Sequence, residues 1–343
     1  MQNKLYDGIH WDPRHLLPYQ RNFNFIASTR NIGKTFGTQI FCMKDSIEKE
    51  NEFVYLVRYK STEKDVGAME KAFEKVCDMK FPEYEFNWTN EEVTLEGQTI
   101  GHCIALTEAE ACKKKSFPKV KNIIFDEYIL DTTDKRRYVG GMNEPEALLK
   151  IYHSIDREED RVRCFLLGNT IEFYNPYHVY PAFNIPLVKP GKIWYSENVL
   201  FEYALPSDKL QHQREGSKFL RMISGTKYGN YAKDSYFEDS TNAFIEKRSK
   251  AAKHMFVIQY KGQNFGIWQD LDKGVLFVDN VFDLSCGIVY ALTLEDHTEN
   301  TLLTKNKTCV LLRYLADNFQ RGTVRFTSQK VRASAIEAIK TIL

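Results

Sequence analysis

The chain has 343 residues, of which 43% are hydrophobic and 27% are charged, so it can bury a substantial core and belongs to neither a disordered nor a fibrous class. Its 47 basic and 46 acidic side chains nearly cancel, so the net charge by itself does not indicate a nucleic-acid partner. No run of about 18 uncharged apolar residues predicts a membrane span, the first residues lack the pattern of a secretion signal, and the 7 scattered cysteines predict reduced thiols in a cytosolic setting.

Strand-like and helical patterns alternate through the first part of the chain. A hairpin-like insertion at residues 86–95 interrupts this alternation. Such alternation predicts an α/β fold with a mostly parallel sheet and helices on both faces. We therefore interpret residues 1–205 as one α/β domain. Its main strands are expected at 23–27, 52–57, 121–125 and 163–167, and its main helices at 34–48 and 145–155.

The character of the sequence changes after residue 205. Residues 206–240 are polar and rich in Gly, Ser and Tyr, which indicates a linker with a short helical stretch near 216–223. The remaining residues, 241–343, show the element order of an RNase H-like α+β domain, which begins with an antiparallel meander. The elements expected there are strands at 254–260, 265–270, 275–279 and 288–293, a helix at 308–320, a strand at 323–326 and a final helix.

The strongest local pattern is a candidate phosphate-binding loop between the first strand and the first helix. Backbone N–H groups of such a loop wrap polyphosphate, Lys34 would reach the β- and γ-phosphates of ATP, and Thr35 would ligate Mg²⁺. Ser28 stands where the Walker A pattern has its first glycine, so an ordinary turn before a helix is the alternative. The nucleotide-binding residues proposed on this pattern are Ser28, Thr29, Arg30, Asn31, Ile32, Gly33, Lys34 and Thr35.

Polar side chains also follow two later strands of this domain. Asp126 and Glu127 come directly after an apolar strand, and Asn169 follows the next one. In a P-loop sheet Asp126 would support Mg²⁺ and Glu127 would activate the attacking water, a combination that indicates ATP hydrolysis. Asn169 would sense the γ-phosphate. An acidic turn and an ordinary loop start are the alternatives for these positions.

Hydrolysis also needs a cation for the charge that develops on the transferred phosphate, and a neighbouring subunit often supplies it. Arg157, Arg161 and Arg163 lie in a charged stretch before the strand at 163–167, where an arginine could supply this cation. A lysine run that includes Lys113 could contact DNA phosphate or a neighbour's nucleotide. For both stretches, a solvated loop is the alternative.

The C-terminal domain carries two basic regions. Residues 301–343 hold eight basic and two acidic side chains, and a second cluster lies at 247–253. Such faces suit a nucleic-acid backbone, although basic helices are also often only solvated. The strand at 254–260 contains no acidic residue, whereas an RNase H-like nuclease needs a carboxylate there to hold its metal ions. We therefore expect nucleic-acid binding without nuclease activity.

Taken together, these motifs resemble those of the DNA-packaging ATPases of phi-29-type tailed phages, small relatives of terminase large subunits and of the FtsK/HerA translocases. The phosphate loop keeps the family's internal arginine, Arg30, and its Ile-Gly-Lys-Thr ending. The strand that ends in Asp126 and Glu127 also matches. In the stretch 157–164, Arg157 stands at the position of the family's trans-acting arginine.

Further segments of the chain extend the resemblance over nearly its whole length. Lys113 falls at a lysine position of the family before Pro118. Residues 55–60 resemble a segment that holds another trans-acting basic residue. Because Val57 replaces a second arginine of the family there, Arg58 and Lys60 are both open, and Lys60 is the candidate we select. Segments 175–177, 225–229 and 244–250 are also similar to the family.

The resemblance implies an ATP- and Mg²⁺-dependent motor that translocates double-stranded viral DNA into an empty prohead. It implies a homo-oligomeric ring of five subunits, with the portal and a packaging RNA as partners and no membrane. The protein would act in the host cytoplasm, transiently at the portal vertex, and would be absent from the mature virion. The alternatives are a cellular or plasmid DNA translocase or helicase of the same superfamily, and a non-enzymatic nucleic-acid scaffold with an inactive phosphate loop.

Overall fold

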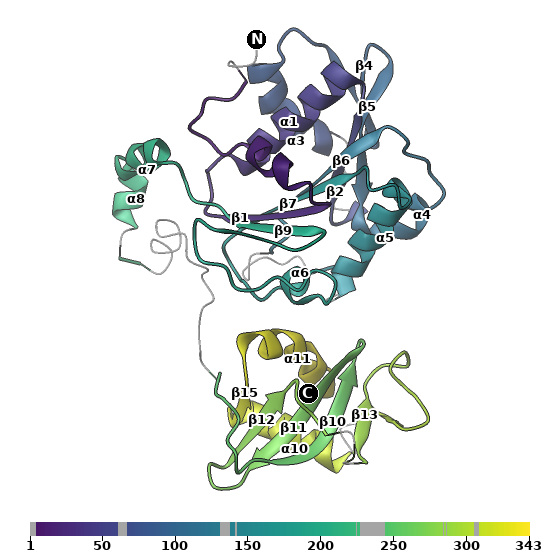
Figure 1. Cartoon of the computed structure of the whole chain (residues 1–343), viewed down its shortest axis with the longest axis vertical. Coiled ribbons are helices and arrows are strands. Elements are labelled where there is room, and N and C mark those ends of the chain that lie inside the picture. Colours follow the sequence, from purple (N-terminus) through teal and green to yellow (C-terminus); the bar gives the residue numbers. More distant parts are fainter. Residues whose placement is uncertain are drawn as a thin grey trace. The chain divides into compact units, whose positions relative to one another are not determined.

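The computed structural model describes residues 5–60, 67–130, 138–140, 143–223, 225–226, 244–283, 285, 287–304 and 309–343. The chain divides into two compact units (Figure 1). The first comprises Met1–Phe173 and Ile185–Asp239, and the second comprises Tyr174–Asn184 and Ser240–Leu343. The division expected from the sequence differs in two respects, because residues 174–184 group with the second unit and residues 206–239 group with the first.

The first unit is built on a nine-stranded sheet with the order β3-β4-β5-β2-β6-β7-β1-β9-β8. From β5 to β9 in this order the neighbours are parallel, whereas β3, β4 and β8 are antiparallel additions at the edges. The strands are β1 (Phe23–Ser28), β2 (Glu52–Val57), β3 (Phe86–Trp88), β4 (Glu92–Leu95), β5 (Gln98–Ala105), β6 (Val120–Asp126), β7 (Arg163–Asn169), β8 (Ile193–Tyr195) and β9 (Val199–Tyr203).

Helices cover both faces of this sheet (Figure 1). α1 (Lys34–Lys49) connects β1 to β2, and α5 (Glu144–Asp156) connects β6 to β7, so the two connections cross the sheet in opposite directions. Because crossovers between parallel strands are right-handed, α1 and α5 lie on opposite faces. α1 packs with α3 (Ala68–Lys80) and with the 3₁₀ helix η1 (Pro13–Tyr19), and α5 packs with α4 (Ala109–Cys112) and with the 3₁₀ helix η2 (Leu106–Glu108).

The central strands are buried on both faces, as their apolar sequences require. All six residues of β1 are buried, and β6 and β7 are only partly exposed at their ends. This mostly parallel, two-faced sheet confirms the expected α/β fold class. The expected strands and helices are present with shifts of one or two residues at their ends. β5, β8, β9 and α3 were not expected from the sequence.

The second unit contains a six-stranded sheet with the order β14-β13-β10-β11-β12-β15. β10, β11 and β12 form the expected antiparallel meander, while β13 and β15 extend it in parallel at its two sides. α10 and α11 pack against each other and against β12 and β15. The elements are β10 (Lys253–Tyr260), β11 (Gln263–Asp270), β12 (Val275–Asp279), β13 (Val289–Ala291), β14 (Leu302–Leu303), α10 (Val310–Gln320), β15 (Val324–Phe326) and α11 (Gln329–Ile342).

The segment expected to be a linker contains two short helices where it is described. α7 (Asp208–Glu215) begins after Ser207 and α8 (Lys218–Met222) begins after Ser217, and each serine oxygen accepts a hydrogen bond from a backbone N–H of the first turn. This is ordinary N-terminal capping. Residues 227–240 of the expected linker lie outside the described residues, as does most of the family-like segment 225–229. The short helix α6 (Pro176–Val179) falls in the family-like segment 175–177.

The described cysteines are all free thiols: Cys42, Cys77, Cys103, Cys112, Cys164 and Cys309. This agrees with the reduced state expected from their spacing. Among the described residues, no helix has the length and apolar character needed to cross a bilayer.

Candidate active site

A cavity of about 700 Å³ opens where the carboxyl ends of β1, β6 and β7 meet. Its lining includes the loop from Arg30 to Phe36, the pair Asp126 and Glu127, and Asn169. The structure therefore brings together the three patterns that the sequence placed on separate strands. The volume lies within the range of ligand-binding pockets.

The backbone of the phosphate loop explains why the first Walker A glycine is not needed. Left-handed backbone conformations occur at Asn31, with a φ of 65°, and at Gly33, with a φ of 94°. Ser28 instead ends β1 in extended pairing with Asn169, a conformation that any residue adopts. Gly33 is required for a second reason, since a Cβ atom there would lie 2.8 Å from the Cβ of His10.

Lys34, the first residue of α1, is buried at the floor of the cavity. Its Nζ donates to the Ser28 Oγ at 2.7 Å and to the Asn169 Oδ1 at 3.2 Å. Burial lowers the pKa of Lys34 to about 8, while the negative charges of Asp126 and Glu127 oppose this shift. The ammonium group and the N-terminus of a 16-residue helix thus point to the same place, which favours a bound anion such as phosphate.

Thr35 and Asp126 form the second part of the site. The Thr35 Oγ1 donates to the Asp126 Oδ2 at 2.9 Å. Burial raises the pKa of the Asp126 carboxyl, although the hydrogen bond from Thr35 and the charge of Lys34 act in the opposite direction. A hydroxyl and a carboxylate oxygen side by side fit Mg²⁺, which keeps several waters and takes further oxygens from phosphate. Among the described residues, no group of three or more His, Cys, Asp or Glu side chains could hold a metal ion.

Glu127 stands next in the chain and projects into the cavity from a constrained backbone. Its φ is 56°, and its N–H donates to the Asp126 Oδ1 at 2.9 Å. The next residue, Tyr128, donates its N–H to the Leu167 carbonyl oxygen at 3.2 Å. The exposed carboxylate of Glu127 is therefore carried by a fixed turn between β6 and β7.

Arg58, which the sequence left open as a trans-acting residue, lies inside its own unit. Its side chain is 1% exposed and forms an ion pair with Glu144, which is fully buried. The Arg58 side chain is therefore used inside its own unit, and Lys60 stays the predicted trans-acting residue of this segment. Sequence reasoning missed the partnership because the two residues are far apart in the chain.

The N-terminal segment forms a wall of the cavity that the sequence did not indicate. Asp7 and His10 line it, and their side chains hydrogen bond at 2.6 Å between Asp7 Oδ2 and His10 Nδ1. The Trp11 N–H donates to the Ile32 carbonyl oxygen at 2.8 Å, which anchors this segment on the phosphate loop. No local motif marks such a contact, because it depends only on where the segment folds back.

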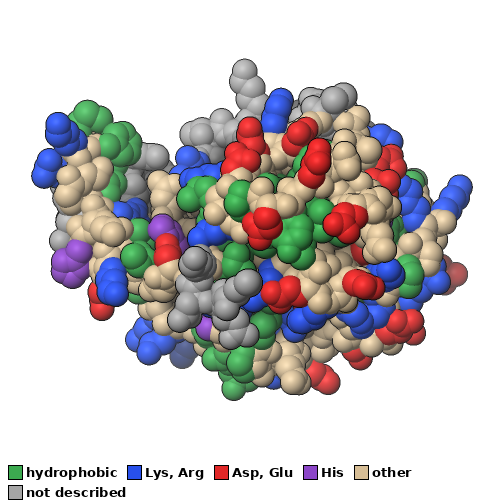
Figure 2. Space-filling view, turned by 90° about the horizontal axis from the view of Figure 1, so that it is seen from above, with side chains coloured by type: hydrophobic (Ala, Val, Ile, Leu, Met, Phe, Trp, Pro, Cys, Tyr) green, Lys and Arg blue, Asp and Glu red, His purple; other side chains and the backbone are tan. Residues whose placement is uncertain are grey.

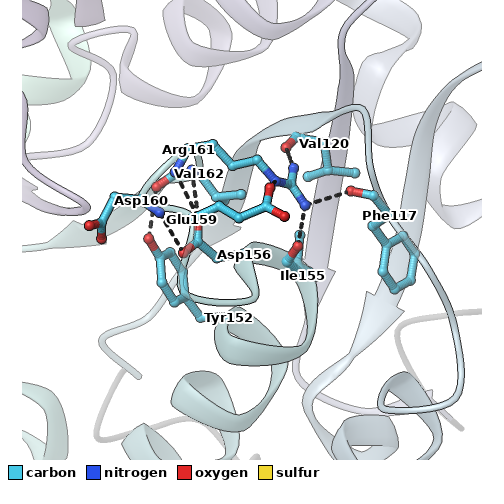
Figure 3. A network of polar contacts seen from close by, with 9 residues as sticks. All are labelled: Phe117, Val120, Tyr152, Ile155, Asp156, Glu159, Asp160, Arg161 and Val162. Carbon is cyan, nitrogen blue, oxygen red and sulfur yellow. Dashed lines mark hydrogen bonds and ion pairs between the residues drawn. The ribbon is translucent and has the colours of Figure 1, made fainter.

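The loop after α5 is held in place by two of its own charged side chains (Figure 3). The buried Asp156 carboxylate accepts hydrogen bonds from the backbone N–H groups of residues 160–162, at 2.9–3.0 Å. The Arg161 guanidinium donates to the carbonyl oxygens of Phe117, Val120 and Ile155. It also pairs with Glu159 at 2.7 Å. Arg161 is therefore structural, because its donors are used within its own chain.

The three candidate arginines differ in burial and in side-chain partners. Arg163 is half-buried at the start of β7, and burial lowers the pKa of its guanidinium. Arg157 is exposed and, within the described part of the chain, makes no side-chain hydrogen bond or ion pair. Its φ is 54°, and Glu158 and Asp160 also have left-handed backbones. Arg157 is the C-terminal capping residue of α5, a position where a left-handed backbone is common.

The other trans-acting candidates also lie at the surface. The Lys60 Nζ pairs with the Glu108 Oε1 at 2.8 Å, and the Lys113 Nζ pairs with the Glu110 Oε2 at 2.7 Å. Exposed ion pairs of this kind contribute little to stability, so either lysine can exchange its partner. Neither lysine, nor Arg157, is among the residues that line the cavity of their own chain.

Known proteins with similar sequences identify the family. Residues 5–342 match the family model described as Podovirus DNA encapsidation protein (Gp16). The chain is also 32% identical, over 334 residues, to the DNA packaging protein of Bacillus phage phi29, which covers 97% of this chain and 98% of that protein. This chain belongs to the podovirus DNA encapsidation protein family.

Solved structures agree with this assignment. The chain is similar to a protein of the bacteriophage Phi-29 viral genome packaging motor assembly, with a TM-score of 0.73 and 31% identity over 98% of this chain and 100% of that one. The N-terminal domain of the DNA packaging ATPase from bacteriophage phi29 matches 58% of this chain and 97% of its own length, with 28% identity and a TM-score of 0.51. The resemblance inferred from the motifs is thereby confirmed.

In this family member, two acidic residues of the second unit have structural partners. Asp279 accepts hydrogen bonds from the Arg248 Nε and the Thr327 Oγ1, both at 3.0 Å. Asp270 accepts from the Ser249 Oγ and from the Lys273 N–H. These carboxylates close turns and join strands, and no metal-binding cluster is present among the described residues.

The basic cluster at 247–253 is partly neutralised inside the second unit. Arg248 pairs with Asp279, and its guanidinium carbon lies 3.7 Å from the ring centroid of Trp268. Lys305 and Lys307 of the C-terminal basic stretch lie outside the described residues.

On the face seen in Figure 2, acidic and basic side chains are interspersed, in keeping with the nearly balanced composition.

Proposed function

We propose that this protein is an ATP-hydrolysing motor that moves double-stranded viral DNA into a preformed prohead. The observation that carries the proposal is the convergence of Lys34, the Thr35–Asp126 pair and Glu127 at one edge of a parallel sheet, in a chain of a DNA-packaging family. Phosphate, metal and water-activating groups are thus within one cavity. This combination supports hydrolysis rather than nucleotide binding alone.

Each residue has a distinct task in the proposed reaction. Lys34 and the backbone of residues 28–35 hold the phosphates, and Asn169, which already contacts the Lys34 Nζ, reports the state of the γ-phosphate. Thr35 and Asp126 would hold Mg²⁺, which neutralises charge on the phosphates. Glu127 orients the attacking water and accepts its proton. The in-line attack then forms a bond between the water oxygen and the γ-phosphorus and breaks the bond from that phosphorus to the β–γ bridging oxygen, so that ADP and inorganic phosphate leave.

The proposal includes a ring in which neighbours share sites. Arg157 lies at the start of the loop after α5, and its side chain is exposed. It does not line the cavity of its own chain, which supports a role in the next subunit's site. Lys60 and Lys113 are further candidates for the same interface. We propose five subunits, on the family's model, with the portal and a packaging RNA as partners, in the host cytoplasm and at the portal vertex rather than in the mature virion.

Phosphate release by the purified protein tests the motor function. We expect Mg²⁺-dependent ATP hydrolysis that double-stranded DNA stimulates, because translocation couples the two. Strand separation on a forked duplex is the comparison that identifies a helicase instead. Absence of hydrolysis with every nucleic acid would leave the non-enzymatic scaffold as the better description.

We further propose that the second unit does not cut DNA. β10 carries no acidic side chain, and the neighbouring acids Asp270 and Asp279 are used in structural hydrogen bonds. Supercoiled plasmid incubated with the full chain and Mg²⁺ or Mn²⁺ should therefore remain intact. If the plasmid is instead converted to nicked or linear DNA, and Asp279→Asn abolishes that cleavage, the proposal is contradicted.

A further inference from the structure

A buried ion pair lies directly behind the water-activating glutamate. Arg58 follows β2 and Glu144 begins α5, and the side chains of both are almost completely excluded from solvent. The Arg58 Nε lies 3.1 Å from Oε1 and 2.9 Å from Oε2 of Glu144, and the Arg58 Nη2 lies 3.0 Å from Oε1. The guanidinium thus meets the carboxylate with two of its nitrogens.

The carboxylate of this pair has a third donor. The Val139 N–H donates to the Glu144 Oε2 at 2.5 Å. Taking two charges out of water is costly, and a well-packed apolar pair often serves stability equally well. A buried pair with this many satisfied partners is therefore better explained by the geometry that it imposes than by the stability that it contributes.

The Nη2 of this guanidinium, which already contacts Glu144, is also directed at the backbone of the active-site turn. The Arg58 Nη2 donates to the carbonyl oxygen of Glu127 at 3.2 Å and to that of Tyr128 at 3.3 Å. Its guanidinium carbon also lies 5.2 Å from the ring centroid of Phe125, the residue before Asp126. Arg58 therefore contacts the end of β6 and the turn that follows it.

The backbone of this turn adopts an uncommon conformation, and hydrogen bonds hold it in place. The φ of Glu127 is 56°, a left-handed conformation that is uncommon for residues other than glycine. The N–H of Glu127 is fixed by Asp126, and the N–H of Tyr128 is fixed by Leu167. The two carbonyl oxygens of the turn are the remaining backbone groups, and Arg58 binds both.

We propose that the Arg58–Glu144 pair is a positioning device that holds the peptide of Glu127, and with it the direction of the Glu127 carboxylate, for attack on ATP. Arg58 is not a catalytic residue, because it is buried and does not line the cavity. The inference rests on the proposed function, in which Glu127 activates water. A displacement of about 1 Å at a reacting group costs about 10²-fold in rate, so loss of the device should lower kcat.

The decisive variant removes both charges at once. Arg58→Met combined with Glu144→Leu leaves no buried charge unpaired, so the fold is expected to be retained. Binding of a fluorescent ADP analogue with Mg²⁺ should change by less than about threefold, because Lys34, Thr35 and the loop are untouched. DNA-stimulated phosphate release should show a kcat lowered by about 10²-fold at unchanged KM. Arg58→Lys, which keeps the charge and some donors, should give an intermediate kcat.

A double-mutant cycle separates positioning from general damage. If the pair acts only through Glu127, adding the double variant to Glu127→Gln should lower the residual single-turnover rate no further. Asp45→Asn is the matched control. Asp45 is a buried acid that accepts from Asn122 at the opposite end of β6, at 3.0 Å, and its loss should leave kcat unchanged.

Three results would overturn the inference. The first is a kcat of the double variant within about twofold of that of the unmodified protein. The second is that the double variant lowers the rate of Glu127→Gln by the same factor as it lowers the rate of the unmodified protein. The third is that Asp45→Asn lowers kcat as much as the double variant does. Normal turnover by Glu127→Gln itself would instead refute the proposed function. If the double variant does not fold, Arg58→Lys provides the test. An unchanged kcat for Arg58→Lys, in protein that unfolds as cooperatively as the unmodified protein, would also overturn the inference.

Discussion

Glu127→Gln should bind ATP and Mg²⁺ normally yet lose turnover by about 10²–10⁴-fold. The amide has nearly the same size as the carboxylate but cannot accept the proton of the attacking water. The groups proposed to hold phosphate and Mg²⁺, Lys34 and Thr35, are unaffected, so affinity should persist. Measurement of nucleotide binding by fluorescence and of phosphate release under single-turnover conditions checks both halves of the expectation.

Two comparisons make this expectation specific to Glu127. Lys34→Ala should lose affinity as well as rate, because the ammonium group is placed to contact phosphate in the ground state. Glu110→Gln, at an exposed acid of the same unit, should alter neither. Undiminished ATPase activity in Glu127→Gln would exclude the residue as the base and would direct attention to Asp126.

Arg157→Ala should abolish hydrolysis in homogeneous rings, by about 10³–10⁵-fold, because the developing phosphate charge would lose its trans-acting cation. In mixed rings, a Glu127→Gln subunit retains Arg157 and can complete the site of an Arg157→Ala neighbour whose Glu127 is intact. Activity should therefore recover in part when the two inactive proteins are mixed. Phosphate release as a function of mixing ratio measures this recovery.

The control for this experiment is a cation on α5, the helix that precedes Arg157. Lys150 lies on α5 and is paired with Glu146 at 3.1 Å, at the surface, so Lys150→Ala should keep the rate within about twofold. No recovery at any mixing ratio would indicate that Arg157 acts within its own subunit. Recovery with Lys60→Ala or Lys113→Ala in place of Arg157→Ala would show that those lysines also cross the interface.

The parts of the site that could be predicted are those encoded by neighbouring residues. The run from Phe23 to Thr35 carries its own strand, loop and helix start, and the apolar run before Asp126 predicts where that strand ends. Because the carboxyl ends of parallel strands share one edge, such local signals also predicted that Lys34 and Asp126 would meet. The positive φ at Gly33 follows from the same local pattern.

Other features were beyond local patterns. Three arginines between residues 157 and 163 look alike in sequence, and only the buried hydrogen bonds of Arg161 and the half-burial of Arg163 leave Arg157 available at the surface. The short strands β8 and β9 were missed because their apolar runs are brief. β9 is defined mainly by its pairing with β1.

The sequence by itself determined the fold class, the position of the phosphate loop and the acids at the strand end, because each depends on residues close together in the chain. Only the tertiary structure decided that Arg58 is buried against Glu144, that the N-terminal segment forms a wall of the cavity, and that Arg161 supports a loop instead of reaching a neighbour. The physical reason is that a charged side chain has no intrinsic preference between solvent, a buried partner and a neighbouring subunit. Contacts between residues far apart in the chain determine which of these three surroundings the side chain has.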